Sequence, residues 1–519
     1  MAHTRDEEIR EITLDYLNKI NIQNPPSPAK IQEELLDAIS ASFQAQNTMR
    51  PKGDKWKIPD RLLTEQVAMV ILHLHPVVNI VCLESNATQD YDLLGLYQNS
   101  GPDVGIYVTE ESAFRKLIRK YCFAATTSEI KDITRMLKED APRKSRCKEK
   151  NLVAVNNGIF DYDAKRLLPF SEEKVFTAKS RVDYNPNAAN VVIHNDDDDT
   201  DWDVESWMED LFDDPELTRL AWELLGAVIR PNVRWNKSAW FFSNTGNNGK
   251  GTLCSLMRNL CGDGTHTSIP LSDFGKDFAL EPLIRSSAII VDENDVGTFI
   301  DKAANLKAVI TGDVIQINRK FKTPIAYQFR GFMVQCLNEM PRFKDKTDSF
   351  YRRQLFVPFH KSFTGRERMY IKDDYLRRRE VLEYVLFKVL NLDYYELSNP
   401  KACREALQDY KLYNDPVRQF VEEMLPQCAW DLLPYAFLYA LYKAWLRKNS
   451  PSSQPQGRNS FINDLKMIIS TGNHGWEIKE DVRVGSKMDK PEALLMLYGL
   501  AEWHAPTDPK KAYDGLVRI

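Results

Sequence analysis

The segment Trp240-Phe-Phe-Ser-Asn-Thr-Gly-Asn-Asn-Gly-Lys-Gly-Thr252 decides how the centre of this chain folds. Its aromatic start is typical of a buried strand, and Leu253, Leu256 and Leu260 follow at helical spacing. The glycine-rich turn therefore joins a strand to a helix, which is the order that a phosphate-binding loop requires. In such a loop the backbone N–H groups and the helix N-terminus hold the phosphates, and Lys250 reaches the β and γ oxygens.

The loop departs from the usual pattern G-x-x-x-x-G-K-[ST] at two positions. Asn244 stands where the pattern has glycine, although asparagine tolerates the left-handed backbone region better than most residues. Gly251 stands where the pattern has a hydroxyl, and Thr252 follows one place later, so the hydroxyl that contacts Mg²⁺ is left open. The predicted nucleotide-binding residues are Thr245, Gly246, Asn247, Asn248, Gly249, Lys250, Gly251 and Thr252. The alternative is a plain glycine turn with no nucleotide role.

A second apolar strand, beginning at Ser287, ends in Asp292 and Glu293. In an ATPase such a pair divides the work, since the first acid holds hydrated Mg²⁺ and the second orients and polarises the attacking water. We therefore predict Asp292 as a metal ligand, with Thr252 as a second candidate, and Glu293 as the catalytic base. Two ordinary solvated acids at a strand end are the alternative.

Two further segments supply candidate catalytic residues. The apolar strand that starts at Gly331 ends in Asn338, whose amide is predicted to contact the γ-phosphate or the attacking water. Arg352 and Arg353 precede another apolar strand, and one of them is predicted to stabilise the transition state in a neighbouring subunit. The alternatives are a turn asparagine and surface ion pairs.

Residues 312–322 alternate apolar and polar side chains up to a basic, aromatic tip, which predicts a hairpin. The cations at such a tip neutralise nucleic-acid phosphates, and the aromatic ring stacks on a base. The predicted DNA-binding residues are Arg319, Lys320, Phe321 and Lys322. A plain exposed hairpin whose lysines protect a sheet edge is the alternative.

The composition is that of a multi-domain globular protein. The chain has 519 residues, 43% hydrophobic and 28% charged, and no apolar run long enough to cross a membrane. Its eight cysteines form no C-x-x-C pair, which argues for free thiols in a reducing compartment. The net charge of −5 is unevenly distributed: residues 194–214 hold eleven acids and no Lys or Arg, whereas 301–360 hold eleven Lys or Arg and five acids.

The pattern predicts a multi-domain α/β chain with five segments. Residues 1–145 read as an α-rich N-terminal domain, in which Ser27 and Pro28 begin a helix with Ile31 and Phe43 on its buried face. Residues 146–203 read as a small β-containing segment, with a strand–turn–strand at 151–161 and an acidic linker at 195–203. Residues 204–365 form the predicted ATPase domain, 366–430 a helical connector and 431–519 a C-terminal domain.

These motifs together resemble the superfamily 3 helicases, of the kind found in poxvirus, phage and plasmid primase-helicases. The matching segments are Gly246–Thr252, Val291–Glu293, Leu306–Asp313, Asn318–Lys322, Leu337–Phe343 and Tyr351–Phe359. The resemblance implies a central AAA+-like P-loop ATPase and a winged-helix-like C-terminal domain. Asp90-Tyr-Asp92 is the only D-x-D pair near the N-terminus, and Gln89 interrupts the strand that a primase site needs, so no primase domain is expected.

The resemblance further implies an ATP- and Mg²⁺-dependent motor that assembles as a homo-oligomeric, commonly hexameric, ring on single-stranded or forked DNA. A primase or other replication proteins are the expected partners, with no membrane association. The expected location is the cytoplasm of a bacterial host, if a phage or plasmid encodes the chain.

Three functions are compatible with the sequence. The first is an ATP-dependent DNA helicase or translocase in the replication of a phage, plasmid or other mobile element. The second is an ATP-binding scaffold or initiator for DNA assembly with little unwinding, which Asn244 and Gly251 favour. The third is an ATPase that senses foreign nucleic acid.

Overall fold

The computed structural model describes most of the chain. The described residues are 4–83, 88–243, 245–295, 299–300, 302–320, 322–449, 454–472, 474–500, 503–504, 508 and 510–519. They form two compact units. The first comprises the described parts of Met1–Val296, Lys302–Glu339 and Arg353–Lys401, and the second those of Gly297–Asp301, Met340–Arg352 and Ala402–Ile519. The five predicted segments stay a prediction.

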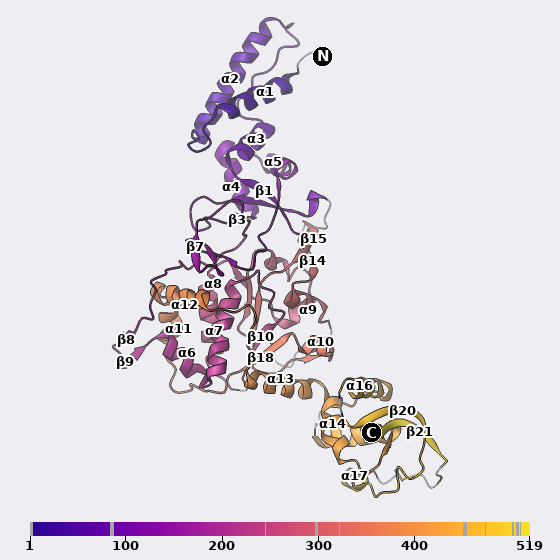
Figure 1. The fold of residues 1–519 in the computed structure, drawn as a ribbon. Helices are drawn as coiled ribbons and strands as arrows, with labels where there is room; N and C mark the ends of the chain where they lie inside the picture. The colour runs from indigo at the N-terminus through magenta and orange to yellow at the C-terminus, as the bar shows by residue number, and fades with distance from the viewer. Residues whose placement is uncertain are drawn as a thin grey trace. The chain divides into compact units, whose positions relative to one another are not determined.

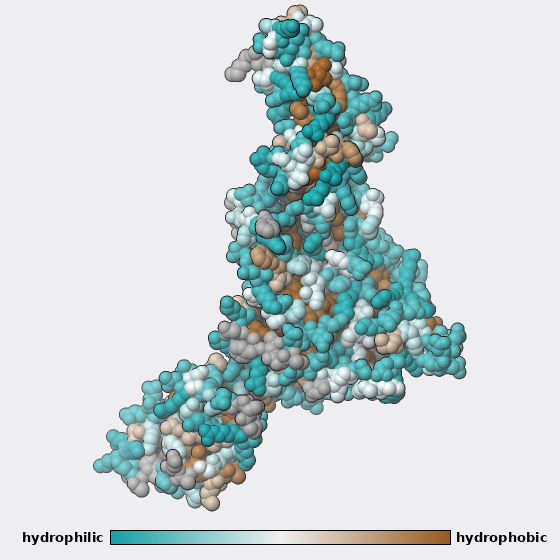
Figure 2. Space-filling view, turned by 180° about the vertical axis from the view of Figure 1, so that it is seen from behind, coloured by the Kyte–Doolittle hydropathy of each residue, from teal (hydrophilic) through white to brown (hydrophobic). Residues whose placement is uncertain are grey.

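The described residues include no helix that is both long and apolar enough to cross a membrane. The face drawn in Figure 2 is largely hydrophilic, with apolar side chains scattered between polar ones.

The N-terminal part of the first unit combines helices with a small sheet (Figure 1). The helices are α1 (Arg5–Lys19), α2 (Pro28–Thr48), α3 (Thr64–Leu74), α4 (Glu111–Tyr121) and α5 (Thr127–Asp140). The sheet has the order β3 (Tyr107–Val108), β2 (Leu93–Tyr97), β1 (Val77–Val81), β4 (Arg143–Ser145).

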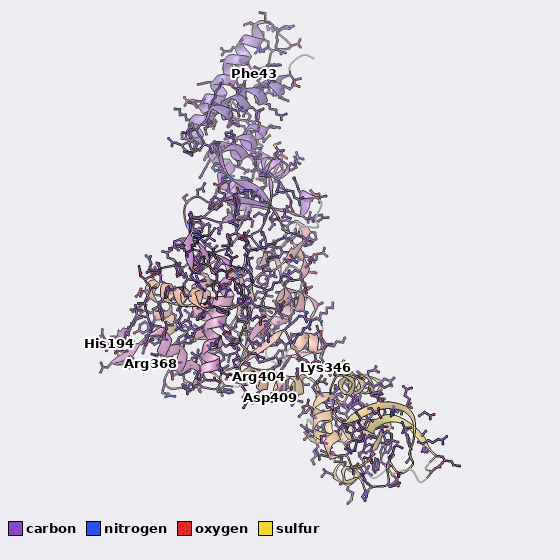
Figure 3. The ribbon with its side chains drawn as sticks, in the orientation of Figure 1. Phe43, His194, Lys346, Arg368, Arg404 and Asp409 are labelled. Atoms are coloured by element: carbon purple, nitrogen blue, oxygen red, sulfur yellow. The ribbon has the colours of Figure 1, made fainter. Side chains whose placement is uncertain are left out.

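Helix α2 begins where the sequence predicts. The Ser27 hydroxyl accepts a hydrogen bond from the N–H of Lys30, and Pro28 occupies the first turn. Ile31 and Phe43 on its apolar face are fully buried, and the Phe43 ring lies 5.0 Å from that of Trp56 (Figure 3). The helical periodicity of this segment was therefore a sufficient guide.

Asp92 has a structural partner. Gln89–Tyr91 form the short 3₁₀ helix η1, and the buried carboxylate of Asp92 accepts a hydrogen bond from Nε of Arg143 at 2.6 Å. This ion pair joins the start of β2 to β4.

The next part of the first unit contains two small antiparallel sheets. The first is the meander β5 (Leu152–Val155), β6 (Gly158–Asp161) and β7 (Arg166–Leu168), which confirms the strand–turn–strand predicted at 151–161. The second is the hairpin of β8 (Ile193–Asn195) and β9 (Thr200–Trp202).

The residues predicted as an acidic linker, 195–203, lie largely within this hairpin. Its turn is held by local polar contacts: Asn195 Oδ1 accepts the N–H of Asp197, and the Thr200 hydroxyl donates to Asp198. Asp199 supplies the left-handed residue of the turn at φ 51°. The run of aspartates hid these contacts because composition alone signals solvated chain.

The acidic hairpin also contacts a later segment. The Tyr370 hydroxyl donates to Asp198 at 2.6 Å, and Arg368 lies 3.7 Å from the same carboxylate. Figure 3 labels Arg368 and His194 in this region. Asp201 hydrogen-bonds His194 and raises its pKa.

A five-stranded parallel sheet forms the centre of the first unit (Figure 1). Its order is β11 (His266–Thr267), β12 (Ala288–Val291), β16 (Phe332–Leu337), β10 (Ser238–Phe242), β18 (Gln354–Pro358). The three middle strands are almost wholly buried, as expected for parallel strands with both faces covered. The helices of this part are α6 (Val204–Phe212), α7 (Pro215–Ile229), α8 (Lys250–Cys261), α9 (Ala304–Thr311), α11 (Met369–Asp373) and α12 (Arg379–Asn391), with 3₁₀ turns η2 (Leu271–Asp273), η3 (Glu281–Ile284) and η4 (Tyr375–Arg377). The mixed α/β class predicted from the sequence is confirmed.

The predicted hairpin at 312–322 is present. Strand β14 (Val314–Arg319) pairs antiparallel with β15 (Lys322–Gln328), and its residues alternate between exposed and buried. Phe321 lies outside the described residues.

The second unit contains helices, two small sheets and its own apolar core. Its elements are β13 (Phe299–Ile300), β17 (Arg342–Phe343), α10 (Asp348–Tyr351), α13 (Lys401–Asn414, whose first residue belongs to the first unit), α14 (Pro416–Met424), η5 (Leu425–Gln427), β19 (Leu432–Pro434), α15 (Tyr435–Asn449), α16 (Arg458–Thr471), β20 (Trp476–Arg483), α17 (Ala493–Leu497) and β21 (Ala512–Arg518). Nζ of Lys346, which is labelled in Figure 3, lies 3.3 Å from Oδ1 of Asp415 and 3.5 Å from Oδ2 of Asp464. These ion pairs tie the loop before α10 to α14 and α16 of the same unit.

The apolar core of this unit includes helix α14, which precedes residue 431, and the predicted boundary there stays a prediction. Val417, Phe420 and Met424 of α14 pack in one cluster with α15, α16 and β21. The amphipathic spacing of α14 explains why it joins the core. The order is α14-η5-β19-α15-α16-β20-α17-β21, with α17 between the last two strands, and the winged-helix interpretation stays a prediction.

Candidate nucleotide-binding site

The loop between β10 and α8 has the backbone geometry of a tight phosphate-binding turn. Gly249 caps α8 in the left-handed region at φ 84°, and its carbonyl accepts the N–H of Leu253 to start the helix. A Cβ on Gly249 would lie 2.3 Å from Leu211 Cδ1, so only glycine fits both the backbone and the packing. Asn247 is also left-handed at φ 49°, while Asn244 lies outside the described residues.

Lys250 lies in the first turn of α8 and is only 5% exposed. Its ammonium donates to Asn248 Oδ1 at 3.1 Å, and the amide of Asn248 donates in turn to the carbonyl of Thr245. Burial lowers the pKa of Lys250. A phosphate in this turn would supply the negative charge that offsets this desolvation. The first turn of α8 also contains no acid, which leaves its positive end open to an anion.

The space around Gly246 and Gly251 suits close approach of a ligand. A Cβ on Gly246 would meet no atom within 4 Å, and one on Gly251 would meet only Lys372 Nζ, at 3.9 Å. Gly251 is therefore not required by packing. Thr252 is half-buried one residue further along the helix.

The predicted acids and the amide converge on the edge that carries this loop. Strand β16 pairs with both β10 and β12, in register from Leu337 to Phe242 and from Gln335 to Val291. Because all three strands are parallel, Asp292, Glu293 and Asn338 emerge at the same edge as the loop. All three are exposed there. The structure thus brings the predicted phosphate loop, Asp292, Glu293 and Asn338 to one edge of the sheet.

Arg258 is a residue of this edge that the sequence did not reveal. It lies two turns along α8 and makes a bidentate contact with Asp292, with Nη1 2.9 Å from Oδ1 and Nη2 bonded to Oδ2. Asp292 remains 42% exposed. The contact holds the carboxylate that is predicted to bind Mg²⁺, so a metal ion would share Asp292 with a guanidinium. The only sign of this role in the sequence is the position of Arg258, two helical turns after Lys250.

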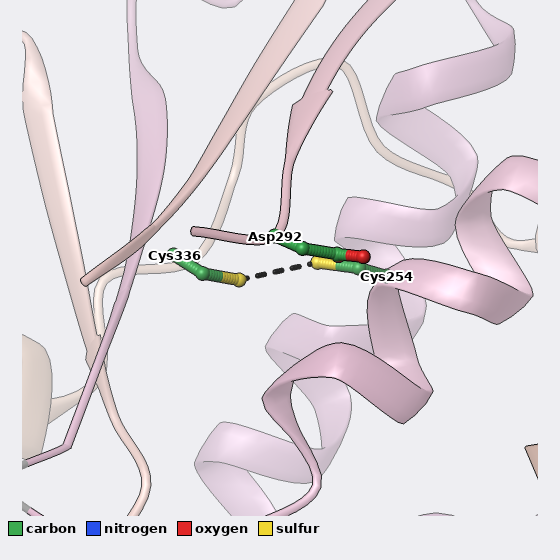
Figure 4. Close-up of side chains that lie close together, drawn as sticks. All are labelled: Cys254, Asp292 and Cys336. Atoms are coloured by element: carbon green, nitrogen blue, oxygen red, sulfur yellow. Dashed lines mark hydrogen bonds between the residues drawn. The ribbon is translucent and has the colours of Figure 1, made fainter. Parts of the chain in front are cut away.

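Two thiols lie behind the same carboxylate (Figure 4). Sγ of Cys254 and Sγ of Cys336 are 3.3 Å apart, and both side chains are buried. The hydrogen bond to Cys336, together with burial, raises the pKa of Cys254 well above its usual range. These two sulfurs and an oxygen of Asp292 all lie within 4.8 Å of one another. Thiols are poor Mg²⁺ ligands, so of these three only Asp292 fits that ion.

A buried amide pair supports the loop after β12. Asn294 donates to Gln335 Oε1 and to the carbonyl of Cys336, both at 3.0 Å, and accepts the N–H of Leu271 at 2.8 Å. Gln335 is fully buried and donates to the carbonyl of Ile269. This network fixes the backbone that carries Asp292 and Glu293. The sign of this network in the sequence is Gln335, a polar residue inside an otherwise apolar strand.

The predicted arginines lie at the other end of the sheet. Arg353 precedes β18, and its carbonyl accepts the N–H of Ser238 at the start of β10, at 2.8 Å. A five-residue strand separates this end from the loop edge by about 16 Å. Arg353 therefore does not belong to the same chain's loop edge, and Arg352, which is exposed, precedes it in the chain.

The cations of the β14–β15 hairpin contact other parts of the first unit. Arg319 donates from Nε and Nη2 to the carbonyl of Thr323, at 3.1 and 2.8 Å. Lys322 Nζ lies 2.7 Å from Glu111 Oε1, on α4. Lys320 is exposed. The tip is thus basic, but two of its predicted DNA contacts are engaged within the chain.

The fold and the edge define the class first: a mixed α/β protein whose central parallel sheet presents a lysine-bearing glycine loop and two acids at one edge. Three known families then match parts of the chain. Residues 52–214 match the D5 N terminal like family, residues 241–353 match a family of unknown function (DUF5906), and residues 412–496 match the Poxvirus D5 protein-like family. Segments similar to D5 proteins therefore flank the sheet region.

Three solved structures with similarity to this chain are of the C-terminal region of NrS-1. The first is 14% identical, covers 78% of this chain and 85% of that chain, and has a TM-score of 0.42. The others are 13% and 11% identical, cover 79% and 87% of this chain and 87% and 98% of theirs, and have TM-scores of 0.40 and 0.42. A search among curated proteins found no match.

Proposed function

We propose that this chain is an ATP-dependent DNA helicase or translocase that acts as a homo-oligomeric ring in the replication of a phage, plasmid or other mobile element. The observation that carries the proposal is the shared edge of β10, β12 and β16, where Lys250, Asp292, Glu293 and Asn338 meet. The matches to D5-type families at 52–214 and 412–496 support a role in replication. The cytoplasm of a bacterial host is the proposed location.

In this proposal each group at the edge has one task. Lys250 and the N–H groups of α8 bind the ATP phosphates, and Asp292 with Thr252 holds Mg²⁺, which neutralises charge on the β and γ oxygens when bound. Glu293 orients and polarises the attacking water. Asn338, beside it, contacts the γ-phosphate or that water.

The remaining tasks fall to a neighbouring subunit and to DNA. Arg353 lies at the end of the sheet opposite the loop, so it, or Arg352 before it in the chain, would serve the site of the next subunit in a ring. Such an arginine contributes roughly 10³–10⁵ in rate. The β14–β15 hairpin grips single-stranded DNA through Lys320 and Lys322.

The test is ATP turnover with and without single-stranded DNA for the wild type, Lys250→Ala and Glu293→Gln. We expect Lys250→Ala to lose ATP binding and about a hundredfold or more in turnover, since it removes a charge that the transition state needs. Glu293→Gln should bind ATP normally and hydrolyse it at a similarly reduced rate. Near-wild-type turnover in both variants would contradict the assignment.

A second candidate function is an ATP-binding scaffold or initiator in which the nucleotide only locks the assembly. It is favoured by the missing hydroxyl at Gly251 and by the guanidinium of Arg258 on Asp292, since both weaken a Mg²⁺ site. The same assay separates the two functions, because a scaffold binds ATP and hydrolyses it negligibly with or without DNA.

A further inference from the structure

Gly251 leaves space beside the first turn of α8, and a lysine from a later segment reaches into it. A Cβ built on Gly251 has one neighbour within 4 Å, Lys372 Nζ at 3.9 Å. Position 251 is where the phosphate-loop pattern places the hydroxyl that contacts Mg²⁺. An ammonium thus lies beside the position at which other loops direct a metal ion onto the phosphates.

The segment that carries Lys372 is anchored on the loop itself. The N–H of Phe363 donates to the carbonyl of Asn247 at 2.7 Å, and the Asn247 side chain donates to Glu367 Oε1 at 2.8 Å. The chain then enters α11, which packs against α8. Lys372 is consequently delivered to the loop by contacts with the loop's own backbone and side chain.

The two residues before Lys372 hold α11 in place. The hydroxyl of Tyr370 donates to Asp198 of the β8–β9 hairpin at 2.6 Å, and Ile371 is buried. Lys372 itself is half-buried. Its side chain therefore starts from a held backbone, which reduces the entropy lost when it binds a ligand.

The electrostatics of this place call for an anion. Lys250 lies in the first turn of α8, Lys372 Nζ lies beside Gly251 of the same turn, and this turn contains no acid. Among the described residues Lys372 has no ion-pair partner within 4 Å. Cations at a helix N-terminus are unfavourable by themselves. A bound polyphosphate offsets this repulsion, because it attracts both the lysines and the helix N-terminus.

We propose that Lys372 is a second phosphate-binding lysine of the nucleotide site, and that it supplies beside Gly251 part of the positive charge that a hydroxyl-bound Mg²⁺ supplies in other phosphate loops. The inference rests on the proposed function. It assigns to Lys372 the terminal phosphates of a nucleoside di- or triphosphate. It also explains how the loop tolerates glycine at position 251.

The experiment measures affinity for ATP and AMP by calorimetry, once with Mg²⁺ and once with EDTA. The variants are Lys372→Met, Lys372→Arg and, as a matched control, Arg377→Met, which removes an exposed cation of η4. Without Mg²⁺ we expect Lys372→Met to weaken ATP binding about tenfold, the effect of losing one charge-assisted hydrogen bond. With Mg²⁺ the loss should be about threefold or less, because the ion then neutralises the same oxygens. Lys372→Arg should stay within about twofold of the wild type, and AMP affinity should not change.

A second substitution tests the link to position 251. Gly251→Ser adds a Cβ that fits at ordinary contact distance, so the fold is retained. In the double variant with Lys372→Met, the new hydroxyl should restore ATP affinity when Mg²⁺ is present and not in EDTA.

Each outcome is decisive. Unchanged ATP affinity of Lys372→Met in EDTA overturns the inference, as does an equal loss in Arg377→Met, which would indicate a non-specific effect of charge. If Lys250→Ala abolishes binding while Lys372→Met does not weaken it, only the role of Lys372 fails. If the folded wild type does not bind ATP with or without Mg²⁺, the proposed function fails, and the inference fails with it.

Discussion

The loop edge of the central sheet and the β14–β15 hairpin differ in how firmly the chain itself specifies their chemistry. At the edge, Asp292 and Asn338 follow buried parallel strands whose register sets where they emerge, and Lys250 begins the helix after the glycine-capped loop. At the hairpin, Arg319 folds back onto Thr323 and Lys322 pairs with Glu111. A motif attached to a buried sheet is placed by packing, whereas a charged tip takes whichever partner lies nearest.

This difference sets what each region needs in order to act. The edge is preorganised, because the Asn294–Gln335 pair and the glycine cap hold it before any ligand binds. The hairpin has to exchange its contacts within the chain for contacts with DNA phosphates, so its affinity depends on a competition between them. Four variants test this contrast, and they are ordered here by the size of the expected effect.

Gly249→Ala tests the preorganised edge most severely. The residue has φ 84°, and an added Cβ would lie 2.3 Å from Leu211 Cδ1, so the cap cannot form without a shift of the loop. We expect ATP affinity to fall about a hundredfold, as the N–H groups that hold the phosphates lose their alignment. Gly275→Ala is the control, since this glycine lies outside the loop and its Cβ meets nothing within 4 Å, and its circular dichroism should match that of the wild type. Equal effects of both substitutions on ATP titrations would show that the cap geometry is not what matters.

Asn294→Ala tests the support behind the edge. The change leaves the N–H of Leu271 and the Oε1 of Gln335 without their partner in a buried place. We expect a loss of about 2 kcal/mol in the free energy of unfolding, measured by urea denaturation, and a reduced rate of ATP hydrolysis. Asn294→Asp keeps the acceptor for Leu271 and loses the donor, which makes it the comparison for the donated bonds. A stability close to that of the wild type would mean that the network does not hold the Asp292 loop.

The sequence predicts those parts of the fold and of the edge that depend on contacts between neighbouring residues. It does not predict contacts between residues that are far apart in the chain. The loop, the strand before it and helix α2 depend on neighbouring residues, whose periodicity is visible in the sequence. Arg258 and Asp292 are 34 residues apart, and Asn294 and Gln335 are 41 apart, so only the folded sheet brings them together. The same applies to Lys372, which reaches Gly251 through α11.

Two segments have contacts that their composition alone does not show. The aspartates at 196–199 read as a linker, yet side-chain contacts to backbone and to Tyr370 turn them into a hairpin. Helix α14 lies in the segment predicted as a connector. Its apolar residues Val417, Phe420, Val421 and Met424 follow helical spacing in the sequence, but only the fold shows that this face packs against α15 and α16.

Lys320→Ala combined with Lys322→Ala tests the hairpin. Each lysine–phosphate contact adds about 0.7 to the salt dependence of single-strand binding, so the double variant should lower that slope by about 1.4. We expect about a tenfold weaker affinity at low salt and loss of DNA unwinding, measured by fluorescence anisotropy and a strand-displacement assay. Lys302→Ala, an exposed lysine off the hairpin, should keep both. Unwinding that survives in the double variant would mean that the hairpin is not the motor contact.

Glu111→Gln gives the smallest effect and addresses the competition directly. Glu111 is the partner of Lys322 at 2.7 Å, and the bond to Lys322 lowers the pKa of this carboxyl, so it is ionised at neutral pH. The pair is largely exposed, and such a pair contributes at most about 1 kcal/mol. Removing the carboxylate charge should therefore raise single-strand affinity by up to about fivefold at low salt, and by less as salt screens the contact. Glu65→Gln removes an exposed charge on α3 and serves as the control. If Glu111→Gln binds DNA no better than that control, Lys322 is not withheld from DNA by Glu111, and the contrast between a preorganised edge and a competing tip does not extend to this residue.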